Sequence, residues 1–339
     1  MRAVVYDRPG RFAVEALRDP EPGPGEVRLR TRITGVCGTD LHLHAGEFAP
    51  TYPLTPGHEI IGEVERVGEG VDLVREGQLV AVDNVVSCMH CSFCRADQHH
   101  LCRDQVALGV SGPGGFAEQV IAPGDKCHPV DDLDPLVAVM AEPTACAVHG
   151  ADVLALSPGS DVLVFGAGPT GLVLAQLLLH GGAARLTVAA PTVFKLDLAR
   201  AYGVDETVLM RRDEPEEARR RLRDLAPEGF DVVIDATGAV SVLEGCIALT
   251  RDGGTVFVYG MAGEEEQMAI RPYEVFRREL TIKGSFAQYF GFPRSLAVLR
   301  SGRVKTEGMI THSFGLDAYG DALDAVRADP TCLKATVVP

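Results

Sequence analysis

An alternation of apolar strands and helices begins near Gly159 and constrains the fold of this 339-residue chain more than any other feature. Its first run, Val162–Phe165, is continuously apolar, which is typical of a strand buried on both faces of a parallel sheet. The runs that follow it are Thr170–His180, Leu186–Ala189, Phe194–Tyr202, Thr207–Leu209, Glu214–Leu225, Val232–Asp235, Val240–Leu249 and Thr255–Val258. Strands and helices of these lengths in alternation predict βαβ units and an α/β, doubly wound domain.

A glycine motif, Gly166-Ala-Gly168-Pro169-Thr170-Gly171, follows the first strand and opens the first helix of this alternation. Glycines at these positions let the backbone approach a pyrophosphate, and the helix N-terminus attracts its negative charge. A tight strand-to-helix turn without a ligand is the alternative. The strand–helix units behind the motif favour a dinucleotide site.

The end of the second strand of the alternation bears on which dinucleotide binds. An acidic residue is expected there, about 20 residues after the glycine motif, to accept hydrogen bonds from the ribose 2′-hydroxyl of NAD. This chain has Ala190 instead, which removes the repulsion that rejects the 2′-phosphate of NADP, and Thr192 and Lys195 are candidates to contact that phosphate. Alternatively, Lys195 only begins the next helix and NAD is preferred. We expect NADP to be favoured slightly over NAD.

The first 150 residues or so have a different texture, because short β-branched runs alternate with clusters of Pro, Gly and Asp. These runs predict strands at Val27–Ile33, Ile60–Val67, Leu79–Val86 and Gly115–Ile121. The tail Ala335–Val338 is apolar and is predicted to be a strand that rejoins this first domain.

Four of the nine cysteines lie within 15 residues, with the spacing C-x2-C-x2-C-x7-C: Cys88, Cys91, Cys94 and Cys102. Four thiolates so close together can close a tetrahedral shell around zinc on one small loop. An iron–sulfur cluster and unpaired surface thiols are the alternatives. A site filled by four protein ligands leaves no position for substrate, so we expect a structural zinc and interpret His90, His99 and His100 as surface polar residues.

A second set of metal-ligand residues is dispersed along the chain. Cys37, His58 with Glu59, and Glu142 provide a soft ligand, an imidazole and carboxylates, which suit a catalytic zinc with an open position. The spacing alone does not show that these residues meet in one site. Taken singly, a cysteine such as Cys37 is more often a core residue, and a histidine such as His58 is more often a loop residue. The remaining cysteines have no metal-like spacing and are predicted to pack as small apolar residues: Cys127, Cys146, Cys246 and Cys332.

Six motifs occur in one order between Gly35 and Gly171, and together they carry a family resemblance that covers essentially the whole length of the chain. They are Gly35-Val-Cys-Gly-Thr-Asp-Leu-His42, Pro56-Gly-His-Glu-Ile-Ile-Gly62, the four-cysteine loop, Gly114-Gly-Phe-Ala-Glu118, Ala141-Glu-Pro143 and the glycine motif. The chain resembles the zinc-containing medium-chain dehydrogenase/reductases of the polyol (sorbitol) dehydrogenase branch. The resemblance implies a GroES-like catalytic domain over 1–150 with a structural zinc lobe at about 86–104, a Rossmann domain over 151–284, and a return to the catalytic domain over 285–339.

The resemblance also implies roles for the dispersed residues. A catalytic zinc would bind Cys37, His58 and Glu142, with Glu59 as an alternating ligand or a neighbour of the ligands. A substrate hydroxyl would bind this zinc and lose hydride to the nicotinamide. The hydroxyl proton would leave through Thr39, which is otherwise a helix-capping hydroxyl.

His42 would pass this proton on, or else is a surface residue. Among cofactor-binding residues, Thr144 would lie near the nicotinamide, and the others would line the strand ends: Thr237, Gly238, Gly260–Gly263 and Ser285. The aromatic residues Phe48, Tyr289 and Phe290 would line an apolar substrate cleft, or else belong to the core or to a subunit contact.

The implied activity is hydride transfer between NAD(P) and a secondary hydroxyl of a polyol, sugar or cyclitol. The alternatives are an L-threonine 3-dehydrogenase and, from another class, a non-catalytic nucleotide-binding redox sensor.

Charge excludes two kinds of partner. The chain has 47 acidic and 32 basic residues, a formal net charge of −15, whereas nucleic acid and anionic membranes attract the opposite sign. The most apolar stretch, Gly171 to Leu179, is far shorter than the roughly 20 residues that span a bilayer, and no targeting signal is recognisable. We therefore expect a cytoplasmic homodimer or homotetramer that acts on a small molecule.

Overall fold

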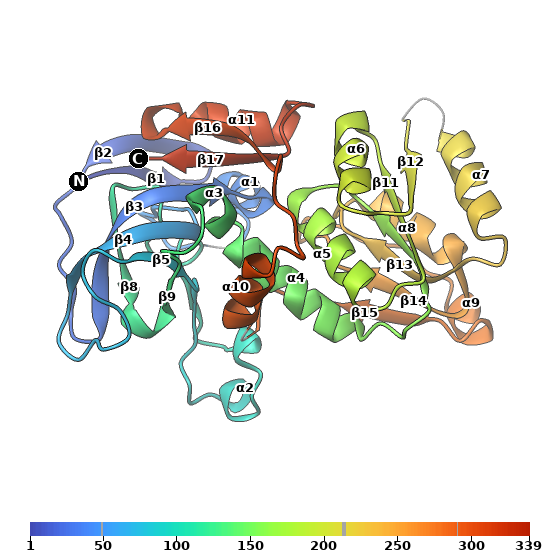
Figure 1. The fold of residues 1–339 in the computed structure, drawn as a ribbon, viewed down its shortest axis with the longest axis horizontal. Coiled ribbons are helices and arrows are strands. Elements are labelled where there is room, and N and C mark those ends of the chain that lie inside the picture. The colour runs from blue at the N-terminus through green and yellow to red at the C-terminus, as the bar shows by residue number, and fades with distance from the viewer. Residues whose placement is uncertain (49, 212–214, 290) are drawn as a thin grey trace. The chain divides into compact units, whose positions relative to one another are not determined.

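A computed structural model describes residues 1–48, 50–211, 215–289 and 291–339 (Figure 1). The chain forms two compact units. The first comprises Met1–Ala145, Gln288–Arg300 and Thr306–Pro339, and the second comprises Cys146–Ala287 and Ser301–Lys305. The helix α4 (Ala141–Leu154) carries the chain from the first unit into the second.

The first unit is built on a sheet of seven strands in the order β16-β17-β3-β4-β5-β9, with β8 also paired to β3. These strands are β3 (Glu26–Val36), β4 (Glu59–Val67), β5 (Leu79–Val82), β8 (Gln119–Pro123), β9 (Cys127–Pro129), β16 (Ile310–Gly315) and β17 (Lys334–Val338). The long strand β3 holds the sheet together, because it pairs antiparallel with β4, β8 and β17. Its side chains Val27 and Leu29 are fully buried in the core.

Shorter elements complete the first unit. They are β1 (Arg2–Arg8), β2 (Arg11–Ala16), α1 (Gly38–Ala45), β6 (Val85–Val86), α2 (Ser92–Arg95), η1 (His99–Leu101), β7 (Val106–Ala107), η2 (Gly124–Lys126), α3 (Pro135–Ala138), α10 (Phe292–Arg300), η3 (Leu316–Ala318) and α11 (Tyr319–Ala328). The helices α1 and α11 pack on each other through a core that includes Leu43, Tyr319 and Leu323.

Two predicted strands differ from the structure. The strand predicted at Leu79–Val86 is divided into β5 and β6, because the carboxylate of Asp83 accepts hydrogen bonds from Val85 N at 3.1 Å and Lys126 Nζ at 3.0 Å. The strand predicted from Gly115 begins only at Gln119, since the backbone of Gly115 is hydrogen-bonded to Gly57 at 2.8 Å in a loop contact. The tail predicted at 335–338 is β17, which pairs antiparallel with β3.

The second unit contains six parallel strands in the order β12-β11-β10-β13-β14-β15. They are β10 (Asp161–Phe165), β11 (Arg185–Ala190), β12 (Glu206–Leu209), β13 (Phe230–Asp235), β14 (Thr250–Val258) and β15 (Thr281–Gly284). The strand order reverses between β10 and β13, as it does in a doubly wound dinucleotide-binding sheet. The predicted α/β fold class is therefore confirmed.

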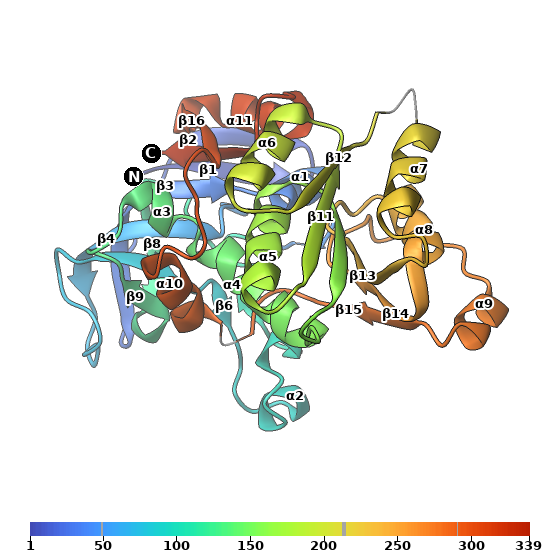
Figure 2. The ribbon, with the colours of Figure 1, turned by 45° about the vertical axis from the view of Figure 1, so that its right-hand side comes forward.

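Helices cover both faces of this sheet (Figures 1 and 2). They are α5 (Pro169–His180) and α6 (Val193–Ala201) on one face and α7 (Pro215–Leu225) and α8 (Val240–Leu249) on the other, with α9 (Pro272–Arg277) at the periphery. Leu163 and Val233 are fully buried between the layers, which explains why the strands are apolar without alternation. Glu214, where the sequence predicts the start of the third helix of the alternation, lies outside the described residues.

Candidate metal centres and dinucleotide site

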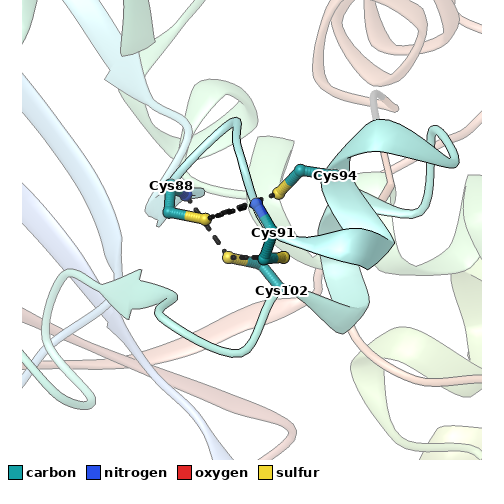
Figure 3. A group of neighbouring side chains, drawn as sticks. All are labelled: Cys88, Cys91, Cys94 and Cys102. Atoms are coloured by element: carbon teal, nitrogen blue, oxygen red, sulfur yellow. Dashed lines mark hydrogen bonds between the residues drawn. The ribbon is translucent and has the colours of Figure 1, made fainter.

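The four clustered cysteines are gathered by one short lobe between β6 and β7 (Figure 3). Cys88 precedes the lobe's first turn, Cys91 caps the N-terminus of α2, Cys94 lies within α2, and Cys102 ends η1. All four sulfur atoms lie within 4.8 Å of one another. The structure thus brings together the four residues that the spacing predicted.

The sulfur geometry fits zinc. Four sulfurs at about 2.3 Å from a tetrahedral ion stand about 3.8 Å apart, and the Sγ–Sγ distances are 3.9 Å for both Cys88–Cys94 and Cys91–Cys102. Backbone amides of Cys94 and Arg103 lower the pKa of the Cys91 thiol to about 6, which favours the thiolate that binds metal. The donor set is therefore suited to a closed metal site.

Of the three nearby histidines that were interpreted as surface residues, one is exposed and two are half-buried. His90 is exposed, and its Nδ1 lies 2.6 Å from the carbonyl oxygen of Cys88. His99 and His100 are half-buried because their rings pack on Tyr289, with centroid distances of 6.4 and 5.0 Å.

The dispersed ligand residues meet at the carboxyl end of β3. Cys37 follows β3 directly, and the antiparallel register pairs Gly35 with Glu59 at the start of β4. The donor atoms of Cys37, His58 and Glu59 consequently lie within 4.8 Å of one another. Glu142 is not part of this group, but it lines the same narrow pocket as Glu59.

The group fits a cation because it contains buried polar atoms that no described residue satisfies. Within the described residues, His58 Nδ1 and Glu59 Oε2 are buried without a hydrogen-bond partner. Burial disfavours a charged His58, but a hydrogen bond from its ring to the Cys37 sulfur and the charges of Asp40, Cys37 and Glu142 outweigh it and raise the pKa of His58 to about 10. An imidazole buried among anionic groups marks a place where a metal ion can supply the positive charge.

Two residues of this site were missed by the sequence reasoning. Asp40 is fully buried, accepts a hydrogen bond from Cys37 N at 2.8 Å, and has Oδ1 at 3.8 Å from His58 Nδ1. Burial raises the pKa of Asp40 to about 6, although the His58 charge opposes this. The signal was its position three residues after Cys37 at the start of a helix, where an acid satisfies a backbone N–H.

Lys334 is the second missed residue. It is only 3% exposed, and its ammonium group donates to Glu59 Oε1. Burial disfavours the charged lysine, but the carboxylate of Glu59 outweighs this and raises the pKa of Lys334 above its usual value. A lysine at the start of the otherwise apolar strand β17 was the available signal, since buried lysines are rare unless they are paired.

Thr39 and His42 lie three residues apart on α1 and therefore share one face of the helix. The Cys37 thiol donates to Thr39 Oγ1 at 3.7 Å, so the predicted hydroxyl lies beside a metal donor. His42 Nδ1 lies 2.8 Å from Glu47 Oε2.

The three glycines of the motif in the second unit have different surroundings. A Cβ at Gly166, where φ is +107°, would lie 2.8 Å from the carbonyl oxygen of Ala236, and one at Gly171 would lie 2.6 Å from that of Gly166. A Cβ at Gly168, the N-cap of α5, would meet no atom within 4 Å. Two glycines thus permit close packing, and the third leaves open space at the helix N-terminus, where a phosphate fits.

The residues predicted to distinguish the ribose of NADP from that of NAD lie at or after the end of β11. Ala190 is buried, and its carbonyl oxygen accepts a hydrogen bond from Met210 N at 2.9 Å. Thr192 is the N-cap of α6, but its hydroxyl makes no capping hydrogen bond. The ammonium group of Lys195 lies 5.7 Å from the centroid of the Phe194 ring.

The other predicted cofactor residues fall into two kinds. Thr237 N donates to Asp235 at 2.9 Å, and a Cβ at Gly260 would lie 2.2 Å from Gly238 N, so these strand ends are tightly packed. The hydroxyls of Thr144, in the first unit, and Ser285, in the second, are buried without a hydrogen-bond partner among the described residues. Such hydroxyls are suited to a ligand.

Two of the aromatic residues considered for a substrate cleft, or else for the core or a subunit contact, have different neighbours in the structure. Phe48 packs on the core between α1 and α11, and Tyr289 packs on the histidines of the four-cysteine lobe. Phe290 lies outside the described residues. Of the leftover cysteines, Cys127, Cys246 and Cys332 are buried as predicted, whereas Cys146 is half-buried.

No helix within the described ranges is long and apolar enough to cross a membrane.

Two family models match the chain. The alcohol dehydrogenase GroES-like domain matches residues 23–132, and the zinc-binding dehydrogenase domain matches residues 169–299.

Proteins of known name resemble the chain over its whole length. It is 40% identical over 340 residues to D-arabinitol dehydrogenase 1 of Uromyces fabae, a match that covers 100% of this chain and 97% of that protein. It is 34% identical over 339 residues to an L-threonine 3-dehydrogenase of an Anaeromyxobacter species, covering 97% and 96%. A crystal structure of a zinc-binding dehydrogenase of Sinorhizobium meliloti 1021 bound to NADP has a TM-score of 0.93 at 32% identity and covers 100% and 99%.

Proposed function

Because this chain belongs to the zinc-binding dehydrogenases with an alcohol dehydrogenase GroES-like domain, we propose that it transfers hydride between NAD(P) and the secondary hydroxyl of a polyol or sugar. The observation that carries the proposal is the meeting of Cys37, His58 and Glu59 donor atoms within 4.8 Å. The 40% identity to a D-arabinitol dehydrogenase over the whole chain supports the polyol class of substrate.

Cys37 and His58 hold the catalytic zinc in this proposal, and Glu142 and Glu59 are the two carboxylates that complete its shell in turn. Support comes from the pocket that both carboxylates line. Such a zinc supplies Lewis acidity, which lowers the pKa of a substrate hydroxyl. The four cysteines of the lobe hold a second, structural zinc, with no position left for substrate.

The protein's own residues bind the cofactor and move the proton. The N-terminus of α5 and the open space at Gly168 receive the pyrophosphate, and the Thr144 and Ser285 hydroxyls are further contacts. Thr39 takes the proton of the substrate hydroxyl, and His42 passes it to solvent. The half-buried position of Thr39 beside the Cys37 sulfur supports this order.

The deciding experiment is a screen of oxidation and reduction over polyols, sugars, aminocyclitols and threonine with both cofactors. We expect turnover of a polyol or sugar by the wild type and its loss in Cys37→Ser, which should still fold. Wild-type kinetics in Cys37→Ser would remove Cys37 from the site. Metal analysis that finds one tightly bound zinc and no second one would favour a non-catalytic redox sensor.

A second candidate is an L-threonine 3-dehydrogenase, which the 34% identity to such an enzyme favours. The two candidates share the metal ligands and differ in substrate. Activity on threonine together with none on polyols would select this second candidate.

We further propose that NADP is preferred, since Ala190 presents no negative charge to a 2′-phosphate. Ala190→Asp is expected to shift the ratio of the NADP and NAD dissociation constants toward NAD by at least about 10-fold, because like charges in contact cost more than ~1.4 kcal/mol. Titrations of wild type and variant at one salt concentration measure this ratio. Tighter wild-type binding of NAD than of NADP would contradict the preference.

The partner of this site is a small molecule. We also propose that the chain works in the cytoplasm as a homodimer or homotetramer, and free rather than disulfide-bonded cysteines in the structure agree with a reducing compartment. Sedimentation equilibrium of the zinc-loaded protein tests the assembly.

A further inference from the structure

A carboxylate lies against the histidine at the end of helix α1. His42 Nδ1 and Glu47 Oε2 are 2.8 Å apart, and the two side chains are 24% and 30% exposed. We propose that Glu47 is a positioning residue that holds His42 in the tautomer able to accept the proton released from the substrate.

The turn after α1 places Glu47 back over His42. Gly46 ends the helix with φ of +94°, Gly46 N donates to Leu43 O at 3.0 Å, and Glu47 N donates to His42 O at 3.0 Å. The left-handed glycine reverses the chain, so that a residue five positions later returns to the same face. A Cβ at Gly46 would lie 2.8 Å from the Pro9 side chain, which fixes this turn from the other side.

The hydrogen bond determines which nitrogen of His42 carries the proton. An ionised carboxylate only accepts hydrogen bonds, so Nδ1 of His42 must be the donor to Glu47. In a neutral imidazole the other nitrogen, Nε2, then has a lone pair. The part of the chain that the structure describes gives Nε2 no hydrogen-bond partner, so that lone pair is available to an incoming proton.

A contribution to folding stability does not explain why His42 and Glu47 are paired. Ion pairs at this degree of exposure contribute about 0–1 kcal/mol, and a neutral histidine contributes less. His42 lies on the helix that also carries Thr39, which is three residues before it and next to the metal donor Cys37. A carboxylate behind a histidine that faces a reacting group is the arrangement that orients a general base.

This inference rests on the proposed function. In the oxidation of R2CHOH by NAD(P)⁺, the products are R2C=O, NAD(P)H and one proton. The O–H bond breaks, the proton passes through the Thr39 hydroxyl, and a new N–H bond forms at Nε2 of His42. The C–H bond breaks with its electron pair, which leaves as hydride for the nicotinamide. Glu47 stabilises the resulting imidazolium until Nε2 releases the proton to water.

The first test measures the tautomer and needs no turnover. Long-range ¹H–¹⁵N correlation spectra of the zinc-loaded protein distinguish Nδ1–H from Nε2–H imidazoles, and the His42 signals are assigned by their loss in His42→Asn. We expect Nδ1–H in the wild type and in Glu47→Gln, whose amide oxygen still accepts, and a shift toward Nε2–H in Glu47→Ala. An Nε2–H tautomer in the wild type, or an unchanged tautomer in Glu47→Ala, would overturn the proposal.

The second test separates positioning from binding. We expect Glu47→Ala to lower kcat by about 10- to 100-fold, part of the effect of a general base, while KM stays within about twofold. Glu47→Gln should lose less, because it keeps the tautomer and removes only the charge. A kcat unchanged in Glu47→Ala, or a loss confined to KM, contradicts the proposal.

A matched control comes from another histidine–carboxylate pair of the same unit. His312 Nε2 lies 3.5 Å from Asp329 Oδ2, at 25% and 37% exposure, on β16 and after α11. Asp329→Asn should leave kcat unchanged, and an equal loss there would assign the effect to surface charge and overturn the proposal. A wild type that oxidises no alcohol with either cofactor would refute the proposed function alone, since the tautomer is read independently.

Discussion

At the residue scale, the Glu59 carboxylate occupies space that is free only because the neighbouring strand has a glycine, Gly35, beside it. Gly35 on β3 is the register partner of Glu59 on β4, and a Cβ at Gly35 would lie 1.7 Å from Glu59 Oε2. Real Cβ atoms never come so close to oxygen, so Glu59 reaches Cys37 and His58 only because position 35 has no side chain. Sequence alone attributes Gly35 to a turn or a motif, and the sheet register gives it this specific reason.

We expect Gly35→Ala to displace Glu59 and to reduce bound zinc from two ions per chain toward one, with a loss of activity of at least about 100-fold. The reason is that a misplaced ligand shell costs both affinity and orientation. Elemental analysis and steady-state kinetics measure the two effects. Gly315→Ala is the control, because a Cβ there meets no atom within 4 Å. Full zinc content in Gly35→Ala would contradict the assignment of Glu59.

Lys334 gives a second prediction at this scale. Lys334→Met removes the partner of a carboxylate that is only 1% exposed, and leaving a buried charge unpaired costs about 3–5 kcal/mol. Urea unfolding should report that loss of stability. The double variant Glu59→Gln with Lys334→Met should recover part of it, and a single variant as stable as wild type would show that the pair contributes nothing.

At the element scale, the turn from β10 into α5 separates packing from binding within one motif. A Cβ added at Gly166 or Gly171 would lie less than 3 Å from a backbone carbonyl oxygen. A Cβ added at Gly168, the N-cap of α5, would meet open space. Glycine therefore has two roles in this motif, close packing and space for a ligand, and only the structure shows which glycine has which role. The helix begins at Pro169, whose missing N–H costs nothing at that position.

We expect Gly168→Val to weaken dinucleotide binding by at least about 10-fold without loss of thermal stability, because its side chain occupies the space that a pyrophosphate needs. Gly171→Ala should instead lower the melting temperature, since its Cβ would meet the carbonyl oxygen of Gly166 at 2.6 Å. Cofactor titration and thermal unfolding measure the pair of variants. The reverse pattern would show that the motif serves packing alone.

At the scale of the whole molecule, metal donors and the glycine motif belong to different units. The candidate ligands Cys37, His58 and Glu59 and the four cysteines lie in the first unit, and 166–171 lie in the second. Each unit has its own buried core. Metal binding and dinucleotide binding are therefore separable properties of this chain.

Removal of zinc with a chelator should abolish turnover and open the four-cysteine lobe to proteolysis, while cofactor binding persists. The physical reason is that a closed zinc site holds a short lobe that has little core of its own. Limited proteolysis with mass spectrometry should find new cleavage between residues 88 and 102, and titration should find the cofactor still bound. Loss of cofactor binding with the zinc would contradict the separation.

Local patterns were sufficient to predict β10 to β14 and α5 to α8 of the second unit, because apolar runs and the glycine motif report burial and turns directly. The helix α9 and the edge strand β15 were not predicted. They were less successful in the first unit. Asp83 divides a predicted strand through hydrogen bonds to Lys126 and Gln288, partners distant in sequence. Phe48 and Tyr289 were grouped as candidates for a cleft, the core or a subunit contact because both are aromatic, and the fold packs them on different neighbours.

The sequence by itself determined what is local: the α/β alternation, the glycine motif and the four cysteines, whose spacing on one short loop leaves little freedom of arrangement. Residues far apart in sequence were assembled only by tertiary structure, because pairing of β3 with β4 and β17 brings Glu59 and Lys334 together. The same holds for the choice among carboxylates, where strand register places Glu59 rather than Glu142 in the group with Cys37 and His58. Register is a property of the whole sheet, and no short stretch of sequence contains it.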